Sequence, residues 1–409
     1  MGYKELDTEL SKELKAMLKE IAGFARKVMR PAGIELDKMA DPADVIADGS
    51  ALWDVFKAYR ELNLHALNIP TELGGLAGDT DPKASGVLYE EMGFGDAGLA
   101  ISLGVSANPF RLAAMSPDPK LQQLTRDFVN DTECNLIGCW AITEPIHGSD
   151  WIMGCQPDFD DPKCGPELQT ELKGDEYILT GQKSAWVSNG TIATHAALHV
   201  NLDPSKGMQG NGLAVVPLDL PGVKQGKPLD KIGQRPLNQG EIFFEEVKIP
   251  KAYMVIDNPE MMQVAIKTIL IGANGGMGQL FVGLARAAYE EALNYAKQRV
   301  QGGVPIFEHK NIKLQLFDMF IKVEAARAYA RRMAAYNVLN PPGSAPHAIA
   351  SKVLSTRTAF EVTSESISIF GGNGLAKEYP IEKMFRDARA SMIEDGENNA
   401  LSLLGAADL

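Results

Sequence analysis

The chain has 409 residues, of which 45% are hydrophobic, so it can bury a large core in two or three structural units. Its 40 basic and 53 acidic residues give a formal net charge of −13, which argues against a nucleic-acid partner. Its apolar stretches are shorter than the roughly 18 to 20 residues of a membrane span. The first residues also lack a signal-peptide pattern, so we expect no membrane span and a cytoplasmic location.

The first 135 residues carry helical patterns. Apolar side chains recur at helical spacing from Asp7 to Met29, and Pro31 is expected to end this helix. Further helices are expected over Ala51 to Leu62 and Lys83 to Met92, separated by Pro and Gly residues. These patterns predict an N-terminal α-helical domain over residues 1–135.

Short apolar runs replace the helical patterns near Leu136. They predict a central β-domain over residues 136–250, with strands in the segments Asn135 to Trp140, Tyr177 to Thr180, Ala196 to Val200, Leu213 to Val216 and Glu241 to Glu245. Within this domain, Pro157 to Pro166 is expected to be a surface loop.

Long helical patterns return after residue 250. They cover Ile266 to Arg299, Asn311 to Tyr336 and Ala345 to Phe370, and a short helix is expected after Asn398. Residues 251–409 are therefore predicted to form a C-terminal α-helical bundle domain. The fold class is α+β, with several domains.

Four cysteines, Cys134, Cys139, Cys155 and Cys164, lie close together in the sequence. Only Cys134 and Cys139 approach the close pairing of structural zinc sites, so we expect no metal and four reduced thiols.

Five segments carry candidate chemistry. Hydroxyl, glycine and backbone N–H groups in loops can bind a flat heterocycle or a pyrophosphate, and an aromatic side chain can pack on a ring. In chain order the segments are Ala141 to Asp150, Gly181 to Gly190, Arg299 to Gly303 with Phe307 to Lys310 beyond it, Ile369 to Gly374, and Arg386 to Arg389 leading to Ile393 to Gly396.

In this order and spacing, the segments resemble the acyl-CoA dehydrogenase family from Gly74 to Asp395. The resemblance implies a helical N-domain, a central β-barrel and a C-terminal four-helix bundle. It also implies FAD as cofactor, an acyl-CoA substrate, electron-transfer flavoprotein as electron acceptor, and a homo-oligomer, usually a tetramer, that holds FAD between subunits.

The resemblance assigns site residues by position. Trp140, Ile142, Thr143 and Ser149 match the loop over the flavin, and Trp186, Val187 and Ser188 match the segment that packs on its ring. Arg299, His309, Gly371 and Gly372 match contacts to the diphosphate end of FAD that a neighbouring chain supplies, and Glu397 and Asn399 match cofactor-side positions. Ser149 and Gly396 match contacts to the substrate.

The family base is a Glu before a Gly-Thr pair. The run from Arg386 to Arg389 fixes the register, so the base position falls on Asp395, ahead of Gly396. The shorter Asp side chain, with Glu397 in place of the Thr, is similar to subsets that act on alicyclic CoA thioesters or nitroalkanes. A cyclic or bulky acyl group is therefore a second hypothesis beside a conventional fatty acyl group.

Several readings stay open. Trp186 alone could be a core or edge residue, Gly371 and Gly372 a helix break, and His147 a loop polar group. The glycines from Gly272 to Gly278 imitate a dinucleotide fingerprint, but they follow no strand, and close helix packing explains them better.

Alternative functions are a flavin oxidase of the nitroalkane type and a non-catalytic subunit of a hetero-oligomer. Glu394 and Glu397, which flank Asp395, and Glu91 and Asp96 from the N-terminal block are alternative bases.

Overall fold

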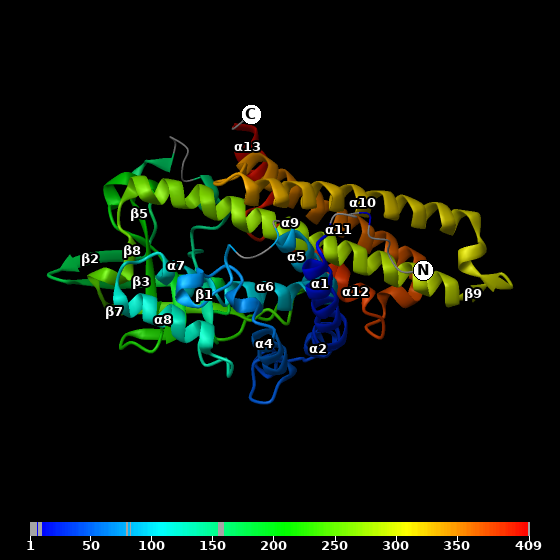
Figure 1. The fold of residues 1–409 in the computed structure, drawn as a ribbon, viewed down its shortest axis with the longest axis horizontal. Coiled ribbons are helices and arrows are strands. Elements are labelled where there is room, and N and C mark those ends of the chain that lie inside the picture. Colours follow the sequence, from blue (N-terminus) through cyan, green and yellow to red (C-terminus); the bar gives the residue numbers. More distant parts are fainter. Residues whose placement is uncertain (1–5, 7–9, 79–80, 82, 154–158, 408–409) are drawn as a thin grey trace.

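Three parts follow one another along the chain in the computed structural model (Figure 1): an N-terminal helical domain, a middle β-domain and a C-terminal helical domain. The structure describes residues 6, 10–78, 81, 83–153 and 159–407. The order confirms the fold class that the sequence predicts.

The N-terminal domain consists of helices that begin with a long, uninterrupted helical segment. Its members are α1 (Lys12–Phe24), α2 (Arg30–Asp37), α3 (Pro42–Val45), α4 (Ala51–Glu61), α5 (Ala84–Gly95), α6 (Ala97–Val105), α7 (Asn108–Ala114) and α8 (Pro119–Asn130).

The expectation that Pro31 ends the first helix is wrong. A π-helical turn over Ala25–Met29 joins α1 to α2, and Pro31 lies in the first turn of α2. The backbone N–H of Arg30 donates to the carbonyl of Ala25, five residues back. A proline lacks the N–H and crowds the carbonyl four residues before it, and this wider turn lets the chain continue past the ring.

The β-domain is a single sheet with strands in the order β6-β7-β3-β1-β4-β5-β8, and β2 pairs with both β3 and β4, so part of the sheet closes on itself. The strands are β1 (Gly138–Ala141), β2 (Gln169–Lys173), β3 (Glu176–Ser188), β4 (His195–Asn201), β5 (Asn211–Pro217), β6 (Val223–Gln225), β7 (Gln239–Pro250) and β8 (Met254–Ile256). The predicted strand segments coincide with or overlap β1, β3, β4, β5 and β7.

The domain boundaries at residues 135 and 250 remain a prediction. Strand β8 lies beyond residue 250 and still pairs with β5.

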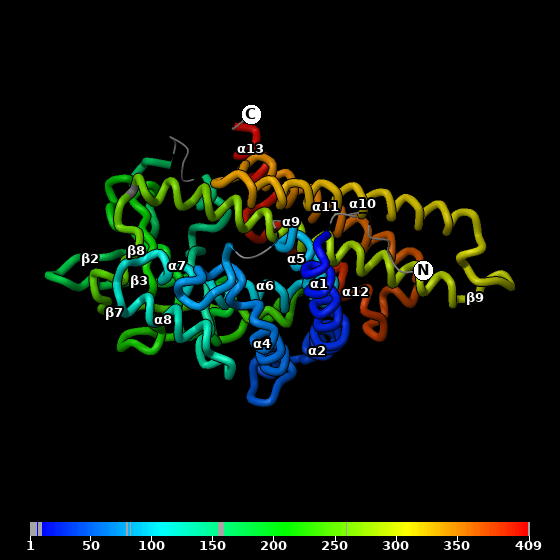
Figure 2. The backbone as a smooth tube through the Cα atoms, in the orientation of Figure 1, coloured from blue at the N-terminus to red at the C-terminus, as the bar shows by residue number. Residues whose placement is uncertain are grey.

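The C-terminal domain contains the longest helices, α9 (Pro259–Gln298), α10 (Lys310–Leu339) and α11 (Ala345–Phe370), followed by α12 (Ile381–Ser391) and α13 (Asn398–Ala407). With 40 residues at 1.5 Å per residue, α9 is about 60 Å long. It runs from the β-domain to the hairpin of β9 (Val300–Gln301) and β10 (Val304–Pro305) at the far end of the molecule (Figure 2). By length and composition α9 could cross a membrane, but 61% of its apolar window is buried inside the fold, as in a core helix.

Glycines on α9 allow neighbouring helices to approach closely. The segment from Gly272 to Gly278 lies well inside α9 and not at the turn between a strand and a helix, which a dinucleotide fingerprint requires. A Cβ atom at Gly278 would lie 3.1 Å from the backbone carbon of Ser351 on α11. A Cβ atom at Gly283 would overlap the carbonyl oxygen of Glu90 on α5.

Candidate active site

The loop between α12 and α13 carries the predicted base in an unusual backbone conformation. Asp395 has φ 51° and Gly396 has φ 96°. The left-handed region suits glycine, and Asp is among the few other residues that tolerate it. A Cβ atom at Gly396 would lie 2.9 Å from the side chain of Leu401, so glycine is required there for space as well. We call Met392 to Glu397 the base loop.

Three separate parts of the chain hold the base loop. The backbone N–H of Glu397 donates to Ser149 Oγ (2.9 Å), in the short helix Ser149–Met153 of the β-domain. Lys352 Nζ on α11 donates to the carbonyl oxygen of Gly396 (2.8 Å). Gln234 Nε2, from the connection between β6 and β7, donates to Glu394 Oε1 (2.6 Å). The position of residue 395 is therefore fixed by contacts to its neighbours.

Burial raises the pKa of Asp395, and the charge of Lys352 opposes this rise. Asp395 nevertheless keeps an exposed surface in the single chain. Protein atoms therefore surround this carboxyl group at longer range, but an incoming molecule can still reach it. A base that takes a proton from a substrate needs such access. Burial also raises the pKa of the neighbouring Glu394 to about 7, against the hydrogen bond from Gln234.

Glu397 caps the last helix. Its Oε2 accepts hydrogen bonds from the backbone N–H groups of Asn399 (2.8 Å) and Ala400 (3.1 Å), at the N-terminus of α13. Asn399 itself is exposed. The structure gives Glu397 a local structural role, and the cofactor contacts of both residues remain predictions.

The end of β3 presents a flat aromatic surface. The side chain of Trp186 is 56% exposed, although it lies on a strand, whereas Val187 is buried. Ser188 Oγ accepts a hydrogen bond from Gln239 Nε2 (3.3 Å). The register of β3 against β7 shifts between Lys183 and Val187, so this stretch contains a bulge or irregularity in the pairing.

The neighbouring loop adds half-buried groups from Trp140, Ile142 and Thr143. Ser184 Oγ is buried and has no hydrogen-bond partner within the described residues. An exposed indole, hydroxyl groups and an unpaired buried oxygen fit the face and polar edge of a flavin ring. These residues of β1, β3 and the loop after β1 are therefore suited to hold FAD.

A buried ion pair supports the loop after β1. Glu144 Oε1 accepts a hydrogen bond from Lys183 Nζ (2.6 Å), and both side chains are fully buried. Burial lowers the pKa of Lys183 to about 8, while Glu144 opposes this decrease. His147 contacts Asp150 through one ring nitrogen and the carbonyl oxygen of Gly165 through the other, which agrees with a loop polar group.

The predicted diphosphate contacts lie at the other end of the molecule. Arg299 ends α9 and is exposed, and His309 Nε2 lies 2.9 Å from the carbonyl oxygen of Gln301 in the adjoining hairpin. Gly371 and Gly372 follow α11, and both are exposed. Figure 1 shows α9 running from the β-domain to the far end of the molecule. Because Arg299 follows the last residue of this helix, which is about 60 Å long, we expect a single chain not to bring these residues to Trp186.

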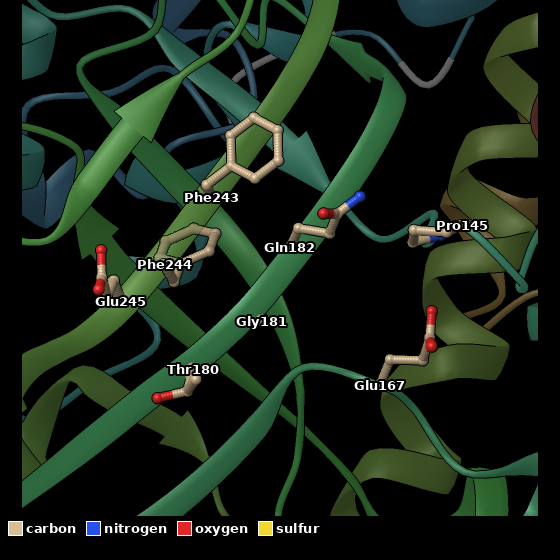
Figure 3. A pocket seen from close by; sticks show the side chains of 8 residues that line it. All are labelled: Pro145, Glu167, Thr180, Gly181, Gln182, Phe243, Phe244 and Glu245. Atoms are coloured by element: carbon tan, nitrogen blue, oxygen red, sulfur yellow. The ribbon is translucent and has the colours of Figure 1, made fainter.

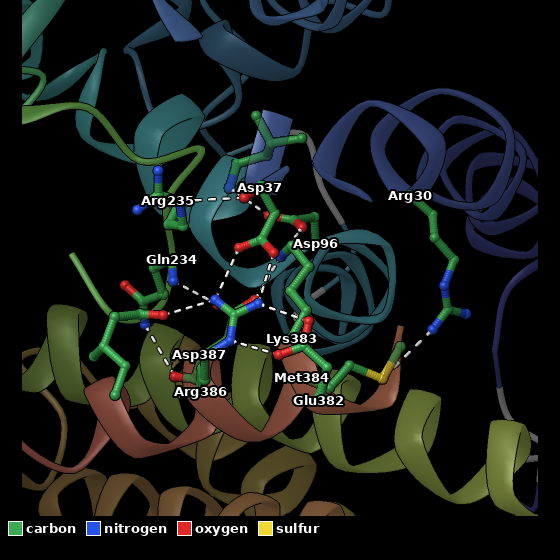
Figure 4. A network of polar contacts seen from close by, with 12 residues as sticks. Arg30, Asp37, Asp96, Gln234, Arg235, Glu382, Lys383, Met384, Arg386 and Asp387 are labelled. Atoms are coloured by element: carbon green, nitrogen blue, oxygen red, sulfur yellow. Dashed lines mark hydrogen bonds and ion pairs between the residues drawn. The ribbon is translucent and has the colours of Figure 1, made fainter. Parts of the chain in front are cut away.

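A network of ion pairs fixes α12, which precedes the base loop (Figure 4). Lys383 Nζ binds both Asp96 (2.5 Å) and Asp387 (2.6 Å), and Arg386 binds Asp37 (2.6 Å). Asp387 also accepts a hydrogen bond from the backbone N–H of Gln234. The network joins the N-terminal domain and the β6–β7 connection to α12, and it engages Asp96, one of the alternative bases.

The other alternative base in the N-terminal domain is also paired. Glu91 binds Arg26 (2.6 Å) and Arg286 (2.7 Å). Both carboxylate oxygens of Glu91 are thus engaged by arginine side chains, so this group is poorly placed to abstract a proton from a substrate.

A groove of about 560 Å³ lies on the outer part of the sheet (Figure 3). Thr180, Gly181 and Gln182 of β3 and Phe243, Phe244 and Glu245 of β7 line it, with Pro145 and Glu167 opposite. The lining contains two acidic residues and no basic ones, so it does not suit the phosphates of CoA. Asp395 is not among the residues that line this groove.

Three cysteines, Cys134, Cys139 and Cys164, are free thiols, and Cys155 lies outside the described residues. Among residues 6, 10–78, 81, 83–153 and 159–407, no group of three or more His, Cys, Asp or Glu could hold a metal ion.

Comparison with protein families agrees with this arrangement. The N-terminal, middle and C-terminal domain models of the acyl-CoA dehydrogenases match residues 11–114, 139–247 and 264–409. The chain belongs to the acyl-CoA dehydrogenase family. The family consists of FAD-dependent oxidoreductases, so FAD is the cofactor and acyl-CoA dehydrogenation is the class of reaction.

Individual relatives match over the whole chain. A probable acyl-CoA dehydrogenase of Bacillus subtilis is 30% identical, over 99% of this chain and 100% of that protein. A cyclohex-1-ene-1-carbonyl-CoA dehydrogenase of Syntrophus aciditrophicus is 27% identical, over 98% of this chain and 91% of that protein. The solved butyryl-CoA dehydrogenase of Megasphaera elsdenii has a TM-score of 0.85 and 25% identity, covering 98% of this chain and 99% of that chain.

Two residues that hold the base loop were not identified from the sequence. Lys352 lies within a helical pattern and Gln234 in a connection between strands, and neither belongs to a sequence motif. A lysine among the apolar and hydroxyl residues of an expected core helix is the one feature that could have indicated Lys352, because an unpaired buried lysine is rare.

Proposed function

We propose that this chain dehydrogenates an acyl-CoA thioester between Cα and Cβ, with Asp395 as the base that takes the Cα proton. The base loop carries the proposal, because it presents an open carboxyl group on a left-handed backbone held by Ser149, Lys352 and Gln234. When bound, FAD supplies the acceptor for the hydride that leaves Cβ.

The environment of Asp395 suits proton transfer. Burial raises the pKa of its carboxyl group, which strengthens it as a base, and the charge of Lys352 opposes this rise. Asp is one methylene shorter than Glu, about 1.5 Å from single-bond geometry, so the acyl Cα must approach more closely than with a Glu base.

We propose a cyclic or bulky acyl group as the substrate class. A ring folds its carbon atoms back toward the thioester, so a C–H bond can come close to a base with a short reach. The full-length similarity to a dehydrogenase named for cyclohex-1-ene-1-carbonyl-CoA supports this proposal. Flavin bleaching with a panel of linear and cyclic CoA thioesters tests it, and bleaching by linear chains alone would contradict it.

We also propose a cytoplasmic homotetramer that passes electrons to electron-transfer flavoprotein. One face of α10 exposes Leu314 (71%), Phe317 (60%) and Ile321 (51%) at helical spacing, as a covered interface would. A second chain could also bring Arg299 and His309 to the flavin segment, which one chain does not do. Sedimentation of the FAD-loaded protein tests the assembly.

The proposed base is tested by stopped-flow flavin reduction with a CoA thioester that the unmodified protein accepts. Asp395→Asn should keep FAD and bind the thioester, yet reduce flavin at least about a hundredfold more slowly, within the range for a general base. Glu91→Gln, Asp96→Asn and Glu397→Gln are the matched controls. Near-normal reduction by Asp395→Asn, with a stall in one control, would assign the base elsewhere.

A further inference from the structure

We propose that Lys352 is a positioning residue for the reaction: its ammonium group holds the base loop through a hydrogen bond, and its charge favours the ionised form of Asp395. The inference rests on the proposed role of Asp395. It adds a second requirement to that role, because a base fixed in position must also be kept in its deprotonated form.

Lys352 contacts the base loop from helix α11. Its side chain is fully buried in α11. Its Nζ donates to the carbonyl oxygen of Gly396 (2.8 Å) and to Asn398 Oδ1 (2.9 Å). Lys352 therefore binds both the residue after the base and the first residue of α13. Both acceptors are neutral, which is uncommon for a buried ammonium group.

A buried charge usually requires a paired opposite charge, because removing it from water costs several kcal/mol. Within the described part of the chain, Lys352 forms no ion pair within 4.0 Å of a carboxylate. Its opposite charges are instead the nearby Glu394, Asp395 and Glu397 of the base loop. The charge of Lys352 therefore acts on the whole loop and is not neutralised by one partner.

The groups facing Asp395 set the direction of the effect. Burial raises the pKa of Asp395, and Lys352 on α11 is the cation that opposes this rise. Glu394 lies next to Asp395 on the loop. Glu394 in turn faces Lys231 as well as Lys352. Burial lowers the pKa of Lys352 to about 8, against Glu394, Asp395 and Glu397, so Lys352 is largely charged at pH 7. Removing this charge should leave desolvation unopposed and raise the pKa of Asp395.

A purely structural role for Lys352 is the alternative to exclude. Thr356, one turn further along α11, offers a matched control, because its Oγ1 accepts a hydrogen bond from Asn398 Nδ2 (3.0 Å) and carries no charge. Thr356→Val should loosen the contact to Asn398, which Lys352 also binds, without removing a charge near Asp395.

The test compares Lys352→Met with Thr356→Val in the FAD-loaded protein, by the pH profile of flavin reduction. Because Asp395 must be ionised to act as the base, the rate of flavin reduction falls at acid pH. Lys352→Met should move this acid limb to higher pH by about one unit, the lower end of the effect of an opposite charge. Thr356→Val should lower the rate evenly and leave the limb in place. An unmoved limb in Lys352→Met would overturn the proposal.

A second readout needs no turnover. A carboxyl group whose pKa is raised on folding destabilises the fold above its unfolded pKa, so Asp395→Asn should raise the melting temperature at pH 8 and have no such effect near pH 3. The gain at pH 8 should be larger when Lys352 is Met. Equal gains in the two backgrounds would refute an action of Lys352 on Asp395.

The two readouts separate failure of the inference from failure of the proposed function. Normal flavin reduction by Asp395→Asn would remove Asp395 as the base, while the melting comparison would still report on Lys352. If Lys352→Met does not fold, Lys352→Gln replaces it, because Gln keeps a donor for the Gly396 carbonyl and lacks the charge. The same shift of the limb is expected, and its absence would contradict the proposal.

Discussion

Replacing Gly283 with Ala should destabilise the fold, although Ala is the better helix former. A Cβ atom at this position of α9 would overlap the carbonyl oxygen of Glu90 and lie 2.7 Å from the backbone nitrogen of Phe94 on α5. The opposite glycine, Gly93, would place its Cβ 2.7 Å from the backbone carbon of Leu280 on α9. The two helices therefore cross with backbone against backbone.

The magnitude follows from two opposing terms. Gly to Ala inside a helix stabilises by about 1 kcal/mol. Overpacking costs about 1–3 kcal/mol, and here the upper part of this range applies because the clashing atoms belong to backbone and cannot rotate away. We expect Gly283→Ala to lower the free energy of unfolding by about 1–2 kcal/mol.

The matched control is Gly272→Ala on the same helix. No atom lies within 4 Å of a Cβ built at Gly272. This change should therefore stabilise by about 0.5–1 kcal/mol, the propensity gain alone. Urea unfolding of both variants beside the unmodified protein measures the difference. Equal stabilisation by both changes would show that α5 and α9 do not pack as closely as described.

Two further predictions concern the site. Trp186→Ala should weaken FAD retention and shift the flavin absorbance spectrum, because the exposed indole is proposed to pack on the ring; a lower melting temperature with an unchanged spectrum would instead indicate a purely structural residue. Glu397→Ala should lower stability by about 1 kcal/mol, the usual effect of losing a helix cap, because it removes the acceptor of the Asn399 and Ala400 N–H groups. Glu397→Ser, which restores a short capping side chain, should recover most of that loss in thermal melting.

Much of the architecture could be predicted from the sequence, because hydrophobic periodicity is a local property. The strand segments around Tyr177 and Ala196 and the long helix that contains Gly272 follow their patterns. The short helix expected after Asn398 is likewise present as α13, whereas α12 was not predicted. These features depend on residues close together in the chain.

The remaining features depend on contacts between distant segments. The helical segment continues past Pro31 because a π-helical turn precedes this residue. Such a turn cannot be predicted from the residue types alone. Lys352 lies 44 positions from Gly396, and Gln234 lies 160 positions from Glu394. Pairings of this kind are fixed only when the domains pack, so a single sequence gives no direct sign of them.

The base loop also has an evolutionary consequence. Within the described part of the chain, the hydrogen bonds of the loop involve Gly396, Glu397, Glu394 and backbone groups, and none uses the carboxyl group of Asp395. A substitution at residue 395 therefore breaks no hydrogen bond of the base loop, provided that the new residue tolerates the left-handed backbone. Selection can change the reach and acidity of the base separately from the scaffold, so a lineage can explore acyl groups of new shape while its stability is preserved.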